Sequence, residues 1–545
     1  MDLEPKIREL LNKRGIVSET EIAEFLSDRP QKTYDPFLLL NMEAGVDLIL
    51  SAIDEGKKIC IYGDYDADGI TSTVIMWEVL SHLTDRLMYH IPSRFDEGYG
   101  LNCDAVREIR EEGADLLITV DCGSVSCEEV AYAKELGMDV LVTDHHQVTD
   151  RIADCIVINP AQPGETYPFR FLAGCGVAFK VCQALVMVTG LPKRALTSTL
   201  DLVGIGTIGD IVPLVDENRT LAKYGLRAVN TGARENLRML IEAVGLKPGK
   251  ITAENVSFVI VPHLNAAGRM VHARIAADLF LTRDPVKAAD SIRQICELNQ
   301  RRKRIQQDTY EECAEMIRSQ YSQDPFLLLP LRDAHEGITG IVAGKIKEEY
   351  YRPTVIVTPV GQGLCKGTGR SIEGIDIYQV LKKSEELFER FGGHKAACGF
   401  TMKEENIPAL RKSIMDQMAE VSSDVWKRDT TPDLEVEGKD LTFHLAEQLS
   451  LLEPCGAGNP RPVIGVRGRS QNAARIGADG QFLRFTARLQ GGECLSCIAF
   501  RNTDEIEAMF RGGRELLIAG TLGVNVWRDR RNLQLITESV SEASV

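Results

Sequence analysis

Short apolar runs and segments of helical periodicity alternate through the first part of the chain. Apolar residues recur with helical spacing over residues 70–83, 103–112 and 127–136. The runs between these segments have the length of buried strands and cover residues 58–62, 87–91, 116–120, 139–143 and 155–158. Strands that alternate with helices of about 10–15 residues are typical of βαβ units and predict a mostly parallel sheet.

The pattern changes further along the chain. Residues 173–320 are mainly helical, and a second α/β stretch follows, with a strand at 354–357 and a glycine-rich segment at 363–374. After a polar linker, short alternating runs predict a small β-barrel; they cover residues 482–488, 497–500, 516–519, 523–527 and 533–536. We therefore expect a multidomain α/β protein with an N-terminal helical segment (1–35), a parallel-sheet domain (36–215), a helical connector (216–325), a smaller α/β domain (326–425) and the barrel (433–545).

The composition is that of an ordinary globular protein, with 44% hydrophobic and 26% charged residues among 545. No apolar run approaches the roughly 18 residues that span a bilayer, and the chain starts without the pattern of a secretory signal. We therefore expect a cytoplasmic enzyme that does not bind a membrane and whose 14 cysteines are reduced. The net charge of −16 argues against a general polyanion binder, but it is compatible with a local basic channel.

Three carboxylates, Asp64, Asp66 and Asp68, follow the first predicted strand at alternate positions. Ligands of open α/β sheets bind outside the carboxyl ends of the strands, and alternate residues of an extended segment point the same way. Converging like charges repel one another unless a cation compensates them. For this cluster alone, an acidic turn with a helix cap is the alternative interpretation.

Polar groups also end two later strands. Asp121 follows the third predicted strand, and Asp144, His145 and His146 follow the fourth. One such Asp is usually a helix cap, but three strands that all end in carboxylates or imidazoles form a much rarer pattern. Asp210 lies in an otherwise apolar stretch and needs a cation or hydrogen-bond donors if it is buried, or it caps a turn.

Together these residues offer at least five oxygen ligands and one or two imidazoles. This set suits Mn²⁺ or Mg²⁺ better than a metal that prefers thiolates. A carboxylate shared between two strand ends would bridge two ions about 3.5–4 Å apart, as in two-metal phosphoryl hydrolysis. The residues alone therefore indicate a two-metal phosphohydrolase.

The order of these clusters resembles the motifs of the DHH phosphoesterase superfamily, here Asp64-Tyr-Asp-Ala-Asp-Gly69, the Asp121 strand end, Asp144-His-His146 and Gly209-Asp-Ile-Val-Pro213. The segments His335-Glu-Gly337, Gly367-Thr-Gly-Arg-Ser371 and Gly392-Gly-His394 resemble the DHH-associated domain. Two further segments narrow the resemblance to the RecJ exonucleases, Leu264-Asn-Ala-Ala-Gly-Arg269 and Leu452-Glu-Pro-Cys-Gly-Ala-Gly-Asn-Pro460. The resemblance implies a 5′-to-3′ exonuclease that degrades single-stranded DNA to 5′-mononucleotides in repair and recombination, with an OB-fold as its last domain.

The resemblance also implies roles for single residues. The metal-ligand positions are matched by Asp66, Asp68, Asp121, His145 and Asp210, with Asp121 as the bridging carboxylate. Asp64 would support the first ion, His146 would face the scissile phosphate, and His394 would reach the site from the second domain. Departures from the family pattern fall at Tyr62, His263 and Ala334, outside the metal ligands. Besides single-stranded DNA, a single-strand-binding protein and a helicase are candidate partners.

Arginines in glycine-flanked or turn-like segments are candidates for holding the DNA. We expect a 5′-terminal phosphate to be bound by Arg94, Arg269 and Arg370, with Thr368 and Ser371. The guanidinium group of arginine matches the geometry of a phosphate, and glycines let backbone N–H groups approach the phosphate oxygens closely. A terminal pocket would account for an exonuclease, whereas an open groove would permit internal cutting. A surface ion pair is the alternative for each arginine.

In the predicted barrel, Phe482, Phe485 and Phe500 alternate with arginines, which suits stacked bases and phosphates, or they form the barrel core. Trp527, in a predicted turn, is the preferred DNA contact. The basic run 301–304 is either a solvated helix face or a surface that binds the phosphate backbone of the DNA leading to the site.

Two rival functions remain open on the sequence. An oligoribonuclease, cyclic-dinucleotide phosphodiesterase or pyrophosphatase on the same scaffold would have no need of the barrel. A nonenzymatic scaffold at replication forks would have lost metal ligands, whereas all five match here.

Overall fold

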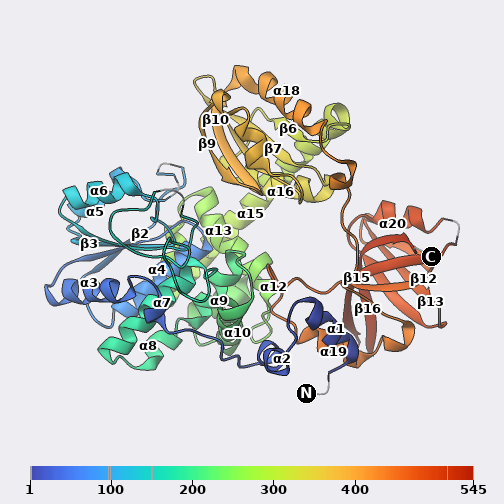
Figure 1. Cartoon of the computed structure of the whole chain (residues 1–545), viewed down its shortest axis with the longest axis horizontal. Coiled ribbons are helices and arrows are strands. Elements are labelled where there is room, and N and C mark those ends of the chain that lie inside the picture. The colour runs from blue at the N-terminus through green and yellow to red at the C-terminus, as the bar shows by residue number, and fades with distance from the viewer. Residues whose placement is uncertain are drawn as a thin grey trace. The chain divides into compact units, whose positions relative to one another are not determined.

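The computed structural model describes residues 3–95, 97–98, 100–148, 151–511, 513–528 and 530–543, without the side chain of Trp527. The chain forms two compact units. Figure 1 shows its helices and strands, coloured along the sequence. The first contains Met1–Pro262, Ala277–Ala288 and Thr430–Val545, and the second contains His263–Ala276 and Ala289–Asp429.

A five-stranded parallel sheet organises the first domain, in the order β2-β1-β3-β4-β5. Its strands are β1 (Ile59–Tyr62), β2 (Leu87–His90), β3 (Leu116–Val120), β4 (Asp139–Thr143) and β5 (Ile156–Ile158). Every residue of β1 and β3 is buried, as expected for parallel strands covered on both faces. The predicted parallel sheet is therefore confirmed, and β1, β3 and β4 lie side by side in it.

Helices cover both faces of this sheet, with α5 and α6 on one face and α3, α4 and α7 on the other (Figure 1). The helices of the domain are η1 (Pro36–Leu38), α3 (Met42–Asp54), α4 (Ala67–Leu80), α5 (Cys103–Glu111), α6 (Cys127–Glu135), α7 (Gly174–Thr189), α8 (Lys193–Thr197) and α9 (Leu200–Gly209). The helical stretch that follows contains α10 (Asp216–Thr231), α11 (Glu235–Ala243), α12 (Ala253–Asn255), η2 (Val256–Ile260), α13 (Val261–Met270), α14 (Arg274–Leu281), α15 (Pro285–Met316) and η3 (Ile317–Tyr321).

The second unit holds a mixed sheet in the order β6-β7-β8-β10-β9, in which only β6 and β7 are parallel. Its strands are β6 (Leu327–Pro330), β7 (Thr354–Gly361), β8 (Leu364–Arg370), β9 (Phe388–His394) and β10 (Ala397–Lys403). Its helices are α16 (Glu336–Tyr350), α17 (Ile377–Lys382), η4 (Glu385–Leu387), η5 (Glu404–Asn406), α18 (Ile407–Met418) and η6 (Ser423–Trp426). Most of the glycine-rich segment 363–374 is therefore strand β8.

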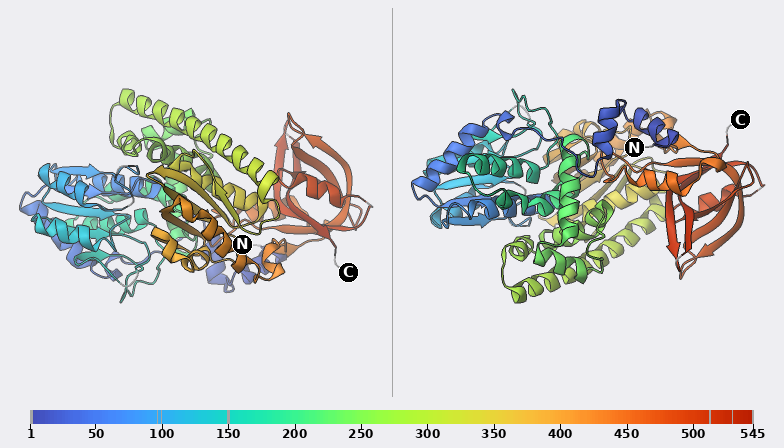
Figure 2. Two further views of the ribbon diagram at one scale, coloured as in Figure 1. Left: turned by 90° about the horizontal axis from the view of Figure 1, so that it is seen from above. Right: turned by 90° about the horizontal axis from the view of Figure 1, so that it is seen from below.

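The C-terminal strands form a closed barrel, because β12 pairs with both β13 and β15 (Figure 2). The strands are β11 (Leu434–Glu435), β12 (Ile464–Ile476), β13 (Phe482–Leu489), β14 (Cys494–Ala499), β15 (Leu516–Trp527) and β16 (Arg530–Glu542), and the helices are η7 (Gly438–Asp440), α19 (Phe443–Ser450) and α20 (Thr503–Met509). The two runs expected at 516–519 and 523–527 are one long strand, β15. Five of these strands, β12 to β16, close the barrel, and β11 pairs with β12. A five-stranded barrel is the architecture of an OB-fold, which confirms this part of the predicted fold class.

The N-terminal helices α1 (Pro5–Lys13) and α2 (Glu19–Leu26) pack on the barrel, and α1 lies beside α19 (Figure 1). Ile7, Leu10 and Leu11 are buried in the same hydrophobic cluster as the barrel residues Leu434 and Phe485. Backbone and side-chain hydrogen bonds, such as the 2.8 Å bond from the Lys13 ammonium to the Asp433 carbonyl, add to this contact. Residues 5–26 and the barrel therefore share one core.

Within the described ranges, no helix is both long and apolar enough to cross a membrane. All 14 cysteines are unpaired. Cys494 is exposed and Cys497 is buried, so these two residues of β14, three positions apart, face opposite sides of the strand.

Candidate functional site

Three adjacent strands of the parallel sheet end in the predicted site residues. Tyr62 of β1 is level with Thr119 of β3, and Val120 of β3 is level with Thr143 of β4. Continuing this register places Asp64, Asp121 and Asp144 in one row at the carboxyl edge of the sheet. All three are buried, with at most 3% of their surface exposed. The edge therefore concentrates carboxylates where an open α/β sheet binds its ligands.

The start of α4 supplies two more carboxylates. Asp66 is the N-cap residue, and its Oδ1 accepts hydrogen bonds from the backbone N–H groups of Asp68 (2.9 Å) and Gly69 (3.1 Å). Asp68 lies in the first turn of the helix, and its carboxylate accepts the backbone N–H groups of Gly174 (2.7 Å) and Cys175 (2.9 Å) at the start of α7. The two interpretations of this acidic segment are therefore compatible, because Asp66 caps α4 and also lies among the candidate metal ligands.

Asp210 is the C-cap residue of α9, and a tight loop follows it. Ile211 has a φ of +62° although its side chain is β-branched, so the backbone directly after Asp210 is strained. Pro213 and Leu214 secure the loop, since the Pro213 carbonyl accepts a hydrogen bond from Asn218 (3.1 Å) and the Leu214 N–H donates to the Ala457 carbonyl (2.7 Å).

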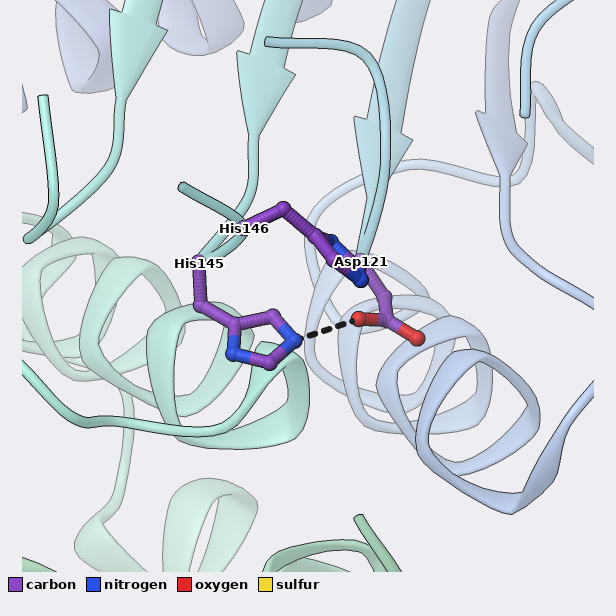
Figure 3. A group of neighbouring side chains, drawn as sticks. All are labelled: Asp121, His145 and His146. Atoms are coloured by element: carbon purple, nitrogen blue, oxygen red, sulfur yellow. Dashed lines mark ion pairs between the residues drawn. The ribbon is translucent and has the colours of Figure 1, made fainter. Parts of the chain in front are cut away.

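The side chains form three groups, each with ligand atoms within 4.8 Å of one another: Asp64, Asp66 and Asp121; Asp121, His145 and His146; and Asp68, His145 and Asp210. Nε2 of His145 lies 3.0 Å from Oδ1 of Asp121 (Figure 3) and 3.5 Å from Oδ2 of Asp210. These two atoms of His145 and Asp121 are buried and do not meet in hydrogen-bond geometry. Asp121 and His145 each belong to two groups, so the arrangement suits two neighbouring cations.

Electrostatics supports a cation at this site. Burial and the neighbouring Asp66 carboxylate raise the pKa of Asp64 to about 8, and burial with Asp68 raises the pKa of Asp210 to about 9. Burial and the surrounding carboxylates also raise the pKa of Asp121 well above its usual value. Such mutual repulsion is relieved by hard divalent cations, and oxygen ligands with one imidazole suit Mn²⁺ or Mg²⁺.

Asp144 positions the two histidines. Its Oδ1 lies 2.8 Å from Nδ1 of His146 and accepts the backbone N–H groups of His145 and His146, while its Oδ2 accepts the N–H of Ser124. Burial alone would raise the pKa of Asp144, but the hydrogen bond and charge of His146 keep it below its usual value. Burial alone would lower the pKa of His146, but Asp144, with smaller contributions from Asp210 and Asp64, raises it to about 9. Asp144 therefore orients His146 at the edge of the site and favours its protonated form.

The second unit brings together most of the predicted DNA-end residues. Nη1 of Arg269 donates a 3.2 Å hydrogen bond to the carbonyl of Gly337 in the first turn of α16. Thr368 on β8 contacts Thr339 of the same helix, hydroxyl to hydroxyl at 3.3 Å. Arg370 ends β8, and a Cβ on Gly340 of α16 would lie 3.1 Å from its guanidinium. Arg269, Thr368 and Arg370 therefore gather beside the N-terminal half of α16.

The other two residues predicted in this unit differ in exposure. Ser371 is buried, and its hydroxyl donates a 2.8 Å hydrogen bond to the Ile375 carbonyl. His394 is exposed at the end of β9. Arg370 and His394 both lie opposite Ala397 of β10, so they occupy the same end of the sheet two strands apart.

Arg94 belongs to the first unit. It follows β2, and its guanidinium carbon lies 5.2 Å from the centre of the Tyr65 ring, beside the Asp64–Asp68 segment. Tyr62, one of the three departures from the family pattern, is fully buried; it stacks on His90 and its hydroxyl donates to the Gly100 carbonyl. Tyr62 therefore belongs to the core beneath the site and not to the carboxylate cluster.

The aromatic residues predicted in the barrel differ in burial. Phe485 is buried in the core, whereas Phe500 is 47% exposed and packs edge-on against Phe482. The side chain of Trp527 lies outside the described part of the chain, and its backbone ends β15 instead of forming a turn. In the basic run on α15, three side chains are exposed and Arg302 is buried.

Sequence reasoning missed two features of the site. Asp144 orients the histidines, and the backbone of Gly174 and Cys175 holds Asp68. The adjacent DHH triplet signalled the first. No local pattern signals the second, because the partners are 106 and 107 residues apart.

Three family models match the chain: the DHH family N-terminal domain over residues 58–207, the DHHA1 domain over 323–420 and the RecJ OB domain over 432–539. The single-stranded-DNA-specific exonuclease RecJ of Bacillus subtilis is 36% identical over 548 residues, which cover 99% of this chain and 68% of the relative. The crystal structure of RecJ in complex with Mn²⁺ from Thermus thermophilus is similar, with a TM-score of 0.82 and 31% identity over 100% of this chain and 79% of that chain. The Mg²⁺ complex from the same organism has a TM-score of 0.80 and 29% identity over 100% and 76%.

Proposed function

Because the chain belongs to the RecJ family of single-stranded-DNA-specific exonucleases, we propose that it degrades single-stranded DNA from 5′ to 3′ and releases 5′-mononucleotides in repair and recombination. It is a metal-dependent hydrolase whose cofactor is Mn²⁺ or Mg²⁺. The observation that carries this function is the carboxylate–histidine centre around Asp121 and His145.

The metal ligands in this proposal are Asp66, Asp68, Asp121, His145 and Asp210, with Asp64 supporting the first ion. Bound metal supplies Lewis acidity, which makes water a nucleophile near neutral pH and offsets charge on the leaving oxygen. Asp121 would hold both ions, since it is common to two of the three ligand groups and its carboxylate, unlike an imidazole nitrogen, offers two oxygens. Its position between β1 and β4 supports this role.

His146 acts on the scissile phosphate. The hydrogen bond that Nδ1 donates to Asp144 fixes the orientation of the His146 ring and favours its protonated form, so that the other ring nitrogen can donate to a phosphate oxygen. A cationic donor stabilises the charge that develops during hydrolysis. We also assign His394 of the second unit to substrate binding, a role supported by its exposure and by its place at the same end of the sheet as Arg370.

The 5′-to-3′ direction of degradation comes from recognition of the 5′ end of the DNA, because a metal centre alone hydrolyses any phosphodiester alike. Arg269, Thr368 and Arg370 meet beside α16, where arginine forks and hydroxyls suit a terminal phosphate. Ser371, next to Arg370 in sequence, belongs to this pocket in our proposal, and Arg94 of the first unit is proposed separately as a DNA contact. The barrel, with Trp527, holds the strand further from the end.

A single-strand-binding protein and a helicase are the partners we propose, since they expose and deliver single strands. We propose the cytoplasm as the location. The DNA substrate and the 14 unpaired cysteines support it, because a reducing compartment keeps thiols free.

End-labelled DNA tests the function. With Mn²⁺, 5′-labelled single strands should release labelled mononucleotide first, while matched blunt duplex and dinucleotides should be poor substrates. Internal fragments as the first products would contradict an exonuclease. Preference for dinucleotides would favour the phosphodiesterase alternative, and no metal-dependent cleavage would favour a scaffold.

A further inference from the structure

Asp68 caps a helix that is distant in sequence. Helix α7 begins at Gly174 with Ala173 as its N-cap residue, and no side-chain hydrogen bond comes from that residue. Instead, the two carboxylate oxygens of Asp68 each accept one backbone N–H, Oδ2 from Gly174 and Oδ1 from Cys175. The first N–H groups of a helix need acceptors from outside the helix, and Asp68 meets this need across 106 residues.

Gly174 also lies against the proposed bridging ligand. A Cβ at this position would lie 2.5 Å from Oδ1 of Asp121, 2.6 Å from its Cβ and 2.7 Å from its Cγ. Asp121 follows β3 directly with a φ of +61° and is 2% exposed. Its backbone conformation and its buried surroundings therefore leave no room for its side chain to move away from a new methyl group. Only glycine admits this contact without moving the Asp121 carboxylate.

We propose that the start of α7 is a positioning element of the metal centre, in which the backbone N–H groups of Gly174 and Cys175 hold Asp68 while the missing side chain of Gly174 leaves room for Asp121. The inference rests on the proposed metal-dependent function and adds residues from outside the ligand set. It assigns a role to Gly174 that depends on its contacts with two ligands and not on contact with DNA.

The physical basis is the usual one for supports of metal ligands. Two backbone donors fix the carboxylate of Asp68 in one orientation, and the positive end of α7 favours negative charge beside it. Residues that orient metal ligands typically change metal affinity or activity by about 10–100-fold when they are replaced. Displacing Asp121 would disturb both proposed metal sites at once, because it belongs to two ligand groups.

A matched pair of glycine substitutions on the same helix turn tests the proposal. In Gly174→Ala the new methyl group meets Asp121, whereas in Gly176→Ala it meets Leu172 at 3.4 Å and Leu221 at 3.8 Å, which is ordinary packing distance. Mn²⁺ affinity is measured by the electron paramagnetic resonance signal of free Mn²⁺, and the fold is checked by circular dichroism. We expect an affinity at least about 10-fold weaker for Gly174→Ala and within about twofold of wild type for Gly176→Ala. Wild-type affinity in folded Gly174→Ala overturns the proposal.

A second measurement keeps the proposal testable if Gly174→Ala does not fold. Hydrogen exchange of the Gly174 and Cys175 amides is compared in the metal-free wild type and in Asp68→Asn, which keeps the shape of the side chain. We expect faster exchange in the variant, and unchanged protection overturns the capping role. If the wild type itself binds no Mn²⁺, the proposed function fails, while the exchange experiment still decides whether Asp68 holds α7.

Discussion

Nδ1 of His146 lies 2.8 Å from Oδ1 of Asp144, and this contact sets the charge of the histidine. Burial by itself lowers the pKa of His146, but Asp144 is the largest of the contributions, ahead of Asp210 and Asp64, that raise it to about 9. In metal-free Asp144→Asn the pKa of His146 should fall by about one unit or more, because the neighbouring negative charge is gone. NMR titration of the ring measures this change. A pKa that stays near 9 would show that Asp144 is not its cause.

The same pair predicts a stability difference with a definite sign. A raised folded-state pKa means that His146 contributes stability that is fully present below about pH 6.5 and is lost as the pH rises through about 9. The difference in melting temperature between the metal-free wild type and Asp144→Asn should therefore become smaller as the pH rises from about 6.5 to about 9. A gap independent of pH would contradict the linkage.

Asp121→Asn tests the bridging ligand. Asp121 has a φ of +61°, which asparagine adopts more readily than alanine, so Asn removes the charge with less backbone strain. We expect hydrolysis to fall by at least about 100-fold. The metal-free protein should melt at a higher temperature, since a buried carboxyl with a raised pKa is gone, and Mn²⁺ should no longer add stability.

Asp104→Asn is the matched control, because Asp104 of α5 belongs to none of the three ligand groups and its side chain is 79% exposed. Its activity and its Mn²⁺-dependent melting temperature should equal those of the wild type. Near-normal activity in folded Asp121→Asn would reject the bridging assignment.

Metal binding should release protons. The pKa values of Asp64 and Asp210, about 8 and about 9, mean that both carboxyls hold protons at neutral pH in the metal-free fold. The folded state then binds more protons than the unfolded chain, so metal-free stability should fall as the pH rises from about 4 to about 9. Mn²⁺ affinity should rise over the same range, since protons compete for the ligands.

Calorimetry in two buffers with different ionisation enthalpies counts the released protons. A count near zero at pH 7, together with pH-independent Mn²⁺ affinity between about pH 6 and 8, would show that the metal-free site is already ionised.

Two arginines on the outer surface of the barrel predict a DNA contact. Arg469 of β12 lies directly opposite Arg488 of β13, and both side chains are exposed. Like charges in such a pair repel each other unless an anion binds them, which suits the phosphates of a single strand. Replacing both with serine should weaken binding to long single strands and reduce the salt slope of log K by about 1.4, at about 0.7 per phosphate.

Turnover of a short, saturating substrate should stay unchanged in this double variant. Arg475→Ser is the control, since Arg475 on the same strand β12 already pairs with Glu507 at 3.0 Å. Unchanged affinity and salt slope in the double variant would exclude this surface from DNA binding.

Deletion of residues 433–545 is a less specific test than these substitutions. It would uncover the apolar faces of Ile7 and Leu10, and it would remove the Ala457 carbonyl that holds the loop after Asp210. We still expect long-strand binding to suffer more than turnover, but any loss of turnover would then have a structural explanation in the Asp210 loop.

Arg370→Ala tests the recognition of the 5′ end. A charge-assisted contact is worth about 1.5–3 kcal/mol, so losing it should cost about 10–150-fold on a 5′-phosphorylated strand. Degradation rates of 5′-phosphate and 5′-hydroxyl substrates are compared, with Arg318→Ala as a control because Arg318 pairs with Glu315 on the surface. A mutant that keeps the wild-type phosphate preference would place the end pocket elsewhere.

The carboxylate row was predictable because buried parallel strands are continuous apolar runs. β3 and β4 have the bounds expected from the sequence, so Asp121 and Asp144 were correctly placed at strand ends. The barrel was less predictable. β12 escaped prediction because Gly465 and Gly468 interrupt its apolar half and its second half is exposed and polar. Contacts such as the one between Gly174 and Asp68 depend on how segments distant in sequence pack together, and the local spacing of apolar residues does not predict this packing.

The core shared by α1 and the barrel has a consequence for synthesis of the chain. Lys13 and its bonding partner Asp433 are 420 residues apart. At about 5–20 residues per second, the ribosome needs roughly 20–80 s to make the segment between them. During that time the apolar faces of α1 and α2 have no barrel to cover them. A chaperone that shields this amphipathic segment early in translation should therefore raise the yield of correctly folded enzyme.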